Sequence, residues 1–243
     1  MTPLKHTILE ESGDFIVYDE ALTRNPGVRL FDPEWWGEKA TSHTEGRGTV
    51  WFLESGDDHW ILKTFQRGGL IARFIKRHYF FCGHSRSRMV REYHLLSRLH
   101  QMGLPVPRPV AACSLRTTWL GYSGSLITQR LRDVESLASC LSTAKTLEVH
   151  RWREIGRTIR RFHDCNVFHS DLNATNILLD ENAVYLIDFD RGRIRSDSYL
   201  GNWRQANLKR LRRSLDKLPV GSIFDRAGAW AALVEGYDNP SVS

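Results

Sequence analysis

Short apolar runs dominate the first third of the chain, and each is only four to six residues long. Apolar runs of this length bounded by turn residues are typical of β-strands. They predict strands at 6–9, 15–18, 50–53 and 60–65. The last two are separated by the sequence SGDD at 55–58, which has the composition of a hairpin turn.

Further along the chain, apolar residues recur three or four positions apart, which is the period of an amphipathic helix. This spacing and the flanking residues predict helices at 86–100, 148–164, 202–218 and 227–234. Gly103 ends the first of these segments, and three closely spaced prolines keep the following stretch extended. Two apolar runs, 177–179 and 184–187, predict a small hairpin around Asp180-Glu181-Asn182.

A β-rich part followed by a helix-rich part indicates an α+β protein with two lobes. The join is expected near residues 129–133. Residues 1–130 then form an N-terminal lobe and residues 131–243 a compact helical C-terminal lobe.

Composition and charge narrow the class of protein without naming it. The chain is 41% hydrophobic and 26% charged, with 8 Trp, 11 Phe and 7 Tyr, which is ordinary for a folded soluble domain. No apolar run approaches the roughly 20 residues of a membrane span, and no signal peptide is evident, so a cytoplasmic location is expected. The net charge of +6 suits anionic partners of several kinds.

The four cysteines are far apart in the sequence and none forms a Cys-x-x-Cys pair. They are Cys82, Cys113, Cys140 and Cys165. Disulfide frameworks and metal sites usually show clustered spacing, so buried free thiols are expected.

The densest concentration of chemically active side chains is the segment 169–176, HSDLNATN, followed at 188–190 by Asp-Phe-Asp. Phosphoryl transfer requires a carboxylate near the acceptor hydroxyl and oxygen ligands for Mg²⁺. The predicted hairpin between the two strings would bring Asn176 and Asp188 to the same end. The alternative is a chance string whose polar residues cap a loop.

These strings resemble those of the protein-kinase superfamily. The pattern H-R-D-L-x-x-x-N is matched at 169–176 with Ser170 in the arginine place, and D-F-G is matched at 188–190 with Asp190 in the glycine place. The resemblance implies a protein-kinase-like fold, ATP as phosphate donor and Mg²⁺ as cofactor. It implies that Asp171 is the catalytic base, that Asn176 and Asp188 hold the metal, and that His169 positions the loop.

The first lobe supplies candidates for binding the nucleotide phosphates. Gly46 and Gly48 precede a predicted strand, and backbone amides at glycines can approach phosphates closely. Lys63 in the next strand would pair with the α and β phosphates, held by Glu92 on the following helix. The alternatives are an ordinary turn at the glycines, a surface lysine on an edge strand, and a helical ion pair of Glu92 with Arg88.

A closer resemblance is to the bacterial 3-deoxy-D-manno-octulosonic acid (Kdo) kinases of the lipopolysaccharide kinase group. It rests on the strings at 103–110, 168–176, 184–192 and 202–208. The absence of an A-P-E pattern and the serine at position 170 also separate the chain from peptide kinases. The resemblance implies transfer of the γ-phosphate to the 4-hydroxyl of Kdo on a lipid A precursor, at the cytoplasmic face of the inner membrane, with no obligate protein partner.

Two basic segments suit an anionic membrane surface. No acidic residue occurs from 66 to 91, where aromatic residues mix with Arg and Lys. The second group consists of Lys209, Arg210, Arg212, Arg213 and Lys217. Solvated helix faces and core aromatics are the plain alternative. RNA could also bind such a mixture and stays a rival partner. No zinc spacing or RNA-binding string accompanies the mixture, and no nucleic acid is expected.

Three functional alternatives stay open on the sequence alone. The chain could be a small atypical protein kinase, a kinase of another sugar, or a pseudokinase that keeps the fold without the chemistry. Retention of Lys63, Asp171, Asn176 and Asp188 together argues against the pseudokinase.

Overall fold

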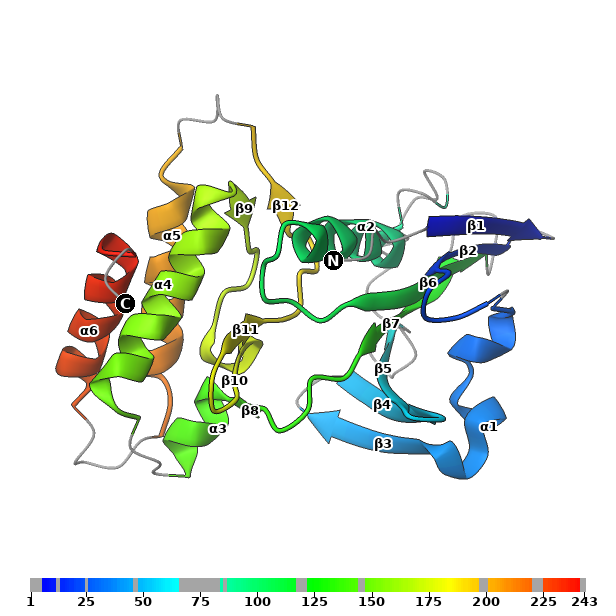
Figure 1. Cartoon of the computed structure of the whole chain (residues 1–243), viewed down its shortest axis with the longest axis horizontal. Helices are drawn as coiled ribbons and strands as arrows, with labels where there is room; N and C mark the ends of the chain where they lie inside the picture. The colour runs from blue at the N-terminus through cyan, green and yellow to red at the C-terminus, as the bar shows by residue number, and fades with distance from the viewer. Residues whose placement is uncertain are drawn as a thin grey trace, which may run out of the picture. The chain divides into compact units, whose positions relative to one another are not determined.

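The structure is a computed structural model that describes residues 6–11, 14–24, 26–45, 48–65, 84, 87–116, 122–143, 147–196, 201–219 and 225–240. The chain divides into two compact units, one of residues 1–101 and 107–130 and one of residues 102–106 and 131–243 (Figure 1). The mixture of a large antiparallel sheet with several helices confirms the predicted α+β class.

The first unit is built on a seven-stranded sheet in the order β1-β2-β6-β7-β5-β4-β3, in which every neighbouring pair is antiparallel. Its strands are β1 (His6–Glu11), β2 (Asp14–Asp19), β3 (Ala40–Glu45), β4 (Gly48–Ser55), β5 (Asp58–Phe65), β6 (Pro109–Arg116) and β7 (Tyr122–Gln129). All four strands predicted in the first third are confirmed. The sequence prediction missed β3, whose residues are mostly polar, and β6, which begins at one of the prolines.

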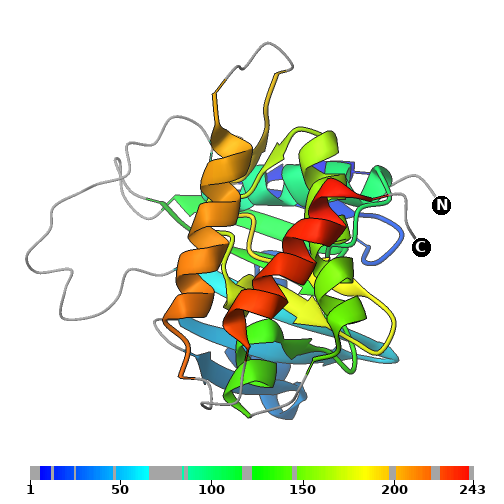
Figure 2. The ribbon, with the colours of Figure 1, turned by 90° about the vertical axis from the view of Figure 1, so that its left-hand side faces the viewer.

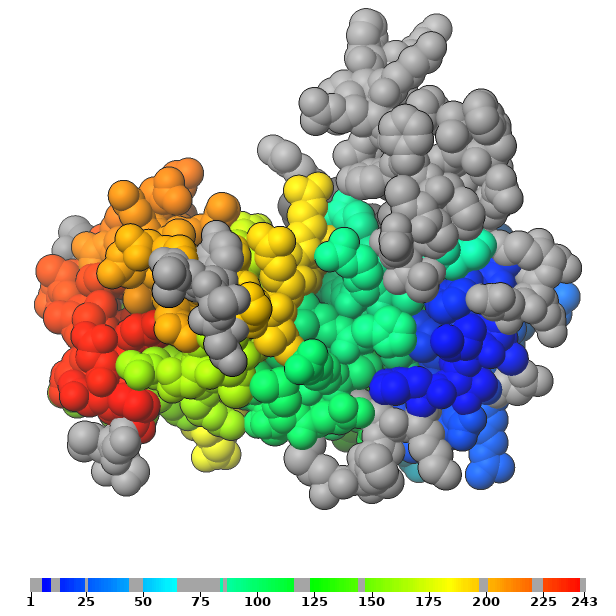
Figure 3. Space-filling view, turned by 90° about the horizontal axis from the view of Figure 1, so that it is seen from above, coloured from blue at the N-terminus to red at the C-terminus, as the bar shows by residue number. Residues whose placement is uncertain are grey.

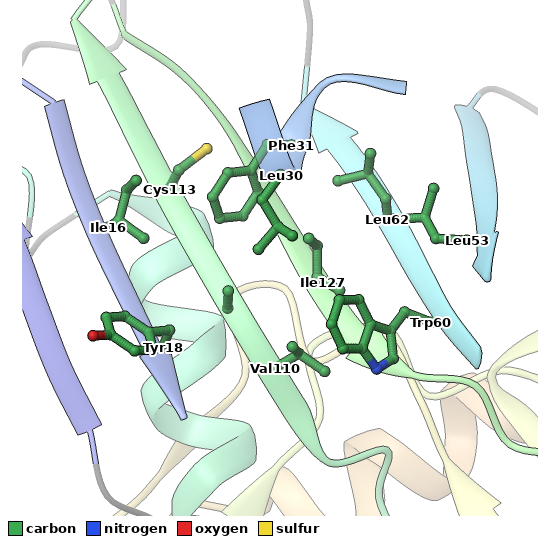
Figure 4. Close-up of a cluster of buried hydrophobic side chains, with 11 residues drawn as sticks. Ile16, Tyr18, Leu30, Phe31, Leu53, Trp60, Leu62, Val110, Cys113 and Ile127 are labelled. Carbon is green, nitrogen blue, oxygen red and sulfur yellow. The ribbon is translucent and has the colours of Figure 1, made fainter. Parts of the chain in front are cut away.

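Helices pack on both faces of this sheet. The short helices η1 (Val28–Phe31), α1 (Pro33–Trp36) and η2 (Gly37–Lys39) follow β2, and α2 (Arg88–Gln101) contacts β6 and β7. Leu30 and Phe31 of η1 pack with Trp60, Leu62 and Ile127 in a buried cluster (Figure 4). Successive residues of a strand point to opposite faces, so Lys63, which follows Leu62, points to the face that carries α2.

The second unit combines four helices with two small sheets. The helices are α3 (Leu137–Ser142), α4 (Val149–Asp164), α5 (Trp203–Asp216) and α6 (Arg226–Asp238). The sheets are β11 (Val184–Leu186), β10 (Ile177–Leu179) and β8 (Glu135–Ser136) in that order, and β12 (Arg193–Ile194) with β9 (Val167–Phe168). Figure 2 shows α6, in red, lying against α4, with α5, in orange, beside it, and Figure 3 shows α5 and α6 together on the surface of this unit.

Glycines allow α4 and α6 to approach until their backbones touch. A Cβ atom at position 156 would lie 1.9 Å from the carbonyl oxygen of Leu233, and one at position 236 would lie 2.0 Å from that of Arg153. Backbone atoms cannot move aside as a flexible side chain can. Gly156 and Gly236 therefore fix the separation of the two helices.

A buried histidine joins the same helices through its side chain. The Nδ1 atom of His163 is 2.7 Å from the hydroxyl oxygen of Tyr237. Burial lowers the pKa of His163 to about 4, although its side-chain hydrogen bond with Asn207 works in the opposite direction. The ring is therefore neutral in the folded protein near pH 7.

The free thiols predicted at Cys113 and Cys140 are confirmed as buried, and the free thiol of Cys165 is half-buried. Burial raises the pKa of Cys113 to about 12, so this thiol is unreactive. Cys82 lies outside the described residues. Among the described helices, none combines the length and the apolar character that crossing a bilayer requires.

Replacing Gly156 by alanine should destabilise the protein by about 2 kcal/mol or more, because the new methyl group meets backbone that must shift. Alanine's intrinsic helix preference, worth about 1 kcal/mol over glycine, would otherwise predict the opposite sign. Urea unfolding measures the change. Gly27→Ala is the control, since a Cβ atom there meets nothing within 4 Å. Equal stability of Gly156→Ala and wild type would contradict the close helix contact.

Acid should destabilise the protein through His163. Its folded pKa of about 4 lies below the unfolded value near 6.5, so the unfolded chain binds the proton first. The contribution is complete above pH 6.5 and is lost progressively down to pH 4, reaching up to roughly 3 kcal/mol. Denaturant unfolding at pH 7.5 and pH 4.5 should show a smaller difference for His163→Gln than for wild type. The exposed His150 gives the control variant His150→Gln, and identical pH dependence in all three proteins would rule the effect out.

Candidate active site

Lys63 and Glu92 meet in the first unit. The Nζ atom of Lys63 lies 3.9 Å from Oε1 of Glu92, with the lysine side chain 30% exposed and the glutamate side chain 3% exposed. A buried carboxylate on α2 thus holds a partly exposed ammonium on β5. This arrangement leaves the ammonium able to meet a phosphate from the solvent side.

The alternative of an edge-strand lysine is contradicted. β5 lies between β7 and β4, and Lys63 is paired with Leu126 on one side and Val50 on the other. Of the two predicted glycines, Gly48 begins β4 opposite Glu45 of β3, so it belongs to the hairpin that joins these strands. Gly46 lies outside the described residues, and phosphate binding by this turn stays a prediction.

In the second unit, the hairpin of β10 and β11 brings together residues that are twelve positions apart. Ile177 pairs with Leu186, and the N–H of Ile187 donates to the carbonyl oxygen of Asn176 over 3.1 Å. Asp188 follows at once. The expectation that Asn176 and Asp188 reach the same end of the hairpin is therefore met by the backbone.

His169 links the loop at 169–176 to the strand end near residue 188. Its Nε2 lies 2.9 Å from the carbonyl oxygen of Ile187, and its Nδ1 lies 3.2 Å from the backbone N of Asp171. A carbonyl can only accept and an N–H can only donate, so the ring is the neutral tautomer with its proton on Nε2. The ring is buried, 4.6 Å from the Phe189 ring.

Helix α5 fastens the same loop from its other side. The amide of Asn207 accepts from the backbone N–H of His169 over 3.3 Å and donates to its carbonyl oxygen over 2.7 Å. Two helical turns further along α5, the hydroxyl oxygen of Ser214 accepts from the backbone N–H of Ala174 over 3.1 Å. The loop is thus held by side chains that are seven positions apart on one face of α5.

Asp171 stands at the exposed tip of this fixed loop. Its side chain is 57% exposed, and its Oδ1 lies 3.3 Å from Nη1 of Arg210 on α5. Its Oδ2 accepts from Nδ2 of Asn173 over 3.2 Å. Both oxygens are therefore oriented, while the carboxylate stays open to a group arriving from solvent.

Asn176 turns its amide nitrogen into the loop. Nδ2 donates to the carbonyl oxygen of Asp171 over 2.9 Å. The backbone N–H of Asn176 donates to Oδ1 of Asn173, the residue that caps the short helix η5 (Ala174–Asn176). Because Nδ2 of Asn176 is held in this way, the direction of the amide oxygen, Oδ1, is determined as well. That oxygen is the donor a metal ion would use.

The backbone near Asp188 adopts an uncommon conformation. Asp188 and Arg191 have φ angles of 62° and 58°, in the left-handed region. Asp190, which occupies the glycine place, is not among the described residues with positive φ. Its carbonyl oxygen instead accepts a hydrogen bond from the hydroxyl of Ser170. Ser170, which stands where the kinase pattern has arginine, thus connects the segment 169–176 to the segment 188–190.

The donor set suits Mg²⁺ bound jointly with phosphates. Within the described part of the chain, no group of three or more His, Cys, Asp or Glu side chains is arranged to hold a metal. Mg²⁺ in phosphoryl-transfer sites is usually bound through one or two protein oxygens, with phosphates and water completing the shell. The oxygens of Asn176 and Asp188 fit that smaller requirement.

The role of α5 in holding the loop is absent from the sequence prediction, which considered an anionic membrane surface or a solvated helix face for its basic residues. The structure divides this group: Arg210 pairs with Asp171, and Arg212 lies 3.3 Å from Asp216 and stacks over Trp230. The i, i+3, i+7 spacing of 207, 210 and 214 was the available signal. The other predicted basic and aromatic segment, residues 68–81, lies outside the described residues.

Comparison with known sequences gives a consistent family. Residues 33–237 match the lipopolysaccharide kinase (Kdo/WaaP) family. A protein from Xylella fastidiosa (strain M23), named 3-deoxy-D-manno-octulosonic acid kinase, is 44% identical over 205 residues, covering 84% of this chain and 80% of the relative. A protein of the same name from Xanthomonas campestris pv. campestris (strain B100) is 42% identical over 205 residues, which also cover 84% of this chain and 80% of the relative.

Comparison with solved structures supports the fold. A structure described as WaaP in complex with acyl carrier protein superposes with a TM-score of 0.56. The match covers 89% of this chain and 87% of that one, at 18% sequence identity. Likeness at this level of identity concerns the fold, and it confirms the predicted fold class.

Replacing Asn207 by alanine should loosen the loop at 169–176, because both backbone groups of His169 lose their partner inside the protein. Buried polar groups left without a hydrogen bond cost about 1–3 kcal/mol each. Hydrogen exchange of the loop amides should rise more than exchange in β4 or β5, and the unfolding midpoint should fall. Gln205→Ala, at an exposed position of the same helix, is the control. Unchanged loop exchange in Asn207→Ala would show that α5 does not hold the loop.

Proposed function

The chain belongs to the lipopolysaccharide kinase (Kdo/WaaP) family, and we propose that it phosphorylates the 4-hydroxyl of Kdo on a lipid A precursor. Membership makes it an ATP-dependent phosphotransferase that acts on a hydroxyl group in lipopolysaccharide biosynthesis. The sugar is supported by relatives at 42–44% identity over most of their length, all named as kinases of this acid. The 4-hydroxyl rests on the family resemblance of the sequence strings.

One observation carries the chemical part of the proposal. Asp171 projects from a loop whose backbone is hydrogen-bonded on both sides, so its carboxylate is exposed yet fixed in place. A base in phosphoryl transfer has to orient the acceptor hydroxyl in line with the γ-phosphate and receive its proton. The exposure and orientation of Asp171 support this role for its carboxylate, and neighbouring polar residues hold the loop.

Lys63 would bind the phosphates of ATP. Its ammonium is attached to an interior strand and held by the buried carboxylate of Glu92, so its position is determined by the sheet and α2 together. A fixed positive charge at this point would orient the α and β phosphates before transfer. The backbone at Gly46 and Gly48 is proposed to cover the same phosphates.

Asn176 and Asp188 would hold Mg²⁺. When bound, Mg²⁺ supplies neutralisation of the charge on the phosphate oxygens. Asn176 contributes an oriented amide oxygen, since its Nδ2 is occupied by the carbonyl oxygen of Asp171. The left-handed backbone at Asp188 sets the direction of its carboxylate relative to the hairpin, a conformation that costs energy and often occurs at functional sites.

The acceptor implies that the protein works at the cytoplasmic face of the inner membrane as a peripheral protein. Lys209 and Arg213 on α5 and Lys217 just after its end are exposed and suit an anionic surface. A related fold has been solved as WaaP in complex with acyl carrier protein, so activity should be measured with and without that protein.

The experiment that tests this function is phosphate transfer from labelled ATP, with and without Mg²⁺, to a Kdo-bearing lipid A precursor. Asp171→Asn should lower the transfer rate by about 10²–10⁴-fold, because the amide cannot accept the hydroxyl proton. Mapping the labelled product identifies the hydroxyl. Glu181→Gln, an exposed carboxylate on the β10–β11 turn, controls for loss of a charge.

The outcomes separate the alternatives. Transfer that needs both Kdo and Asp171 supports the proposal. Phosphorylation of protein, or of a Kdo-free lipid, would replace the substrate and keep the kinase chemistry. ATP binding without any turnover would indicate a pseudokinase.

A further inference from the structure

Arg210 is placed beside the proposed catalytic base by the helix that holds the catalytic loop. It lies on the same face of α5 as Asn207 and Ser214, the two side chains that bind the loop backbone. The contacts on either side of Arg210 therefore fix the part of the helix backbone from which its side chain extends toward Asp171.

Arg210 keeps most of its hydrogen-bonding capacity. Within the described part of the chain, the guanidinium makes one hydrogen bond, from Nη1 to Oδ1 of Asp171 over 3.3 Å. Its side chain is 49% exposed. A guanidinium offers five N–H donors in a planar fork that matches a carboxylate, so the outer edge is available to a second acid group.

We propose that Arg210 forms a carboxylate-binding subsite beside Asp171 that recognises the acid group of the sugar acceptor. The inference rests on the proposed function, because the acceptor named there is itself an acid. Its carboxylate lies a few bonds from the hydroxyl that receives phosphate. An acceptor whose hydroxyl reaches Asp171 therefore brings its carboxylate into the neighbourhood of that residue.

Charge explains why such a subsite is needed. An acidic sugar that approaches Asp171 and the phosphates of ATP meets like charges, which disfavour its binding. A cation next to Asp171 offsets this repulsion and gives the acid an oriented partner. A neutral sugar gains nothing from Arg210, so the same group would select acidic acceptors over neutral ones.

The other cations of α5 are placed differently. Arg212 is engaged by Asp216 and by the ring of Trp230. Lys209 is exposed and lies about 100° around the helix from Arg210. Lys209 therefore provides a matched variant that removes one positive charge from the same helix without removing it from beside Asp171.

The test compares two acceptors, the Kdo-bearing precursor and the same molecule with the Kdo carboxylate blocked as its methyl ester. Wild type should prefer the acid by about 10- to 100-fold in kcat/KM, as expected for loss of a charge-assisted hydrogen bond. Arg210→Gln should lose this preference and treat acid and ester nearly alike, with the additional loss on the acid appearing mainly in KM. Any disturbance of Asp171, which Arg210 contacts, should lower kcat on both acceptors by the same factor. Arg210→Lys should recover part of the preference. Lys209→Gln should keep the wild-type ratio of acid to ester, because any change in membrane binding affects both acceptors equally.

Each result decides the matter. Equal loss on both acceptors would show that Arg210 acts only by orienting Asp171. No loss on either acceptor would show that Arg210 takes no part in acceptor binding. Either result would overturn the subsite and leave the proposed function standing. Failure of wild type to phosphorylate the Kdo acceptor would overturn the proposed function and the subsite with it. Thermal unfolding of each variant confirms that the fold is retained.

Discussion

The side-chain amide of Asn207 is the contact on which the placement of the loop at 169–176 in the second unit depends most. It satisfies both backbone groups of His169, which is buried and could not exchange them for water. The ring of His169 then reaches the carbonyl oxygen of Ile187 and the backbone N–H of Asp171. Helix, loop and strand end thus share one buried polar network, in which each hydrogen bond depends on the placement of the others.

In each unit a buried polar side chain holds an exposed charged group in position. In the first, the buried Glu92 holds the partly exposed Lys63. In the second, the buried His169 holds the loop from which the exposed Asp171 projects. Buried polar groups are costly unless paired, so they are well ordered when they are paired, and the exposed group inherits that order while staying accessible to substrate.

The features that could be predicted from the sequence are those set by neighbouring residues. The hairpin at 177–186 follows from two apolar runs and an Asp-Glu-Asn turn, and it alone brings Asn176 next to Asp188. The strand β6 was missed because its proline marks a strand edge as readily as a loop, and β3 because its polar residues give no alternation. The contact of Arg210 with Asp171 joins residues 39 positions apart, and only the packing of α5 reveals it.

The attachment of α5 through positions 207, 210 and 214 also limits how the gene can change. A single inserted or deleted codon between the first and last of these positions would turn part of the helix by about 100° and separate at least one side chain from its partner. Variation in chain length among descendants of this protein should therefore accumulate outside that interval. With the role proposed for Arg210, exchange of that residue alone would alter acceptor preference, while the helical register around it stays fixed by the contacts of Asn207 and Ser214 with the loop.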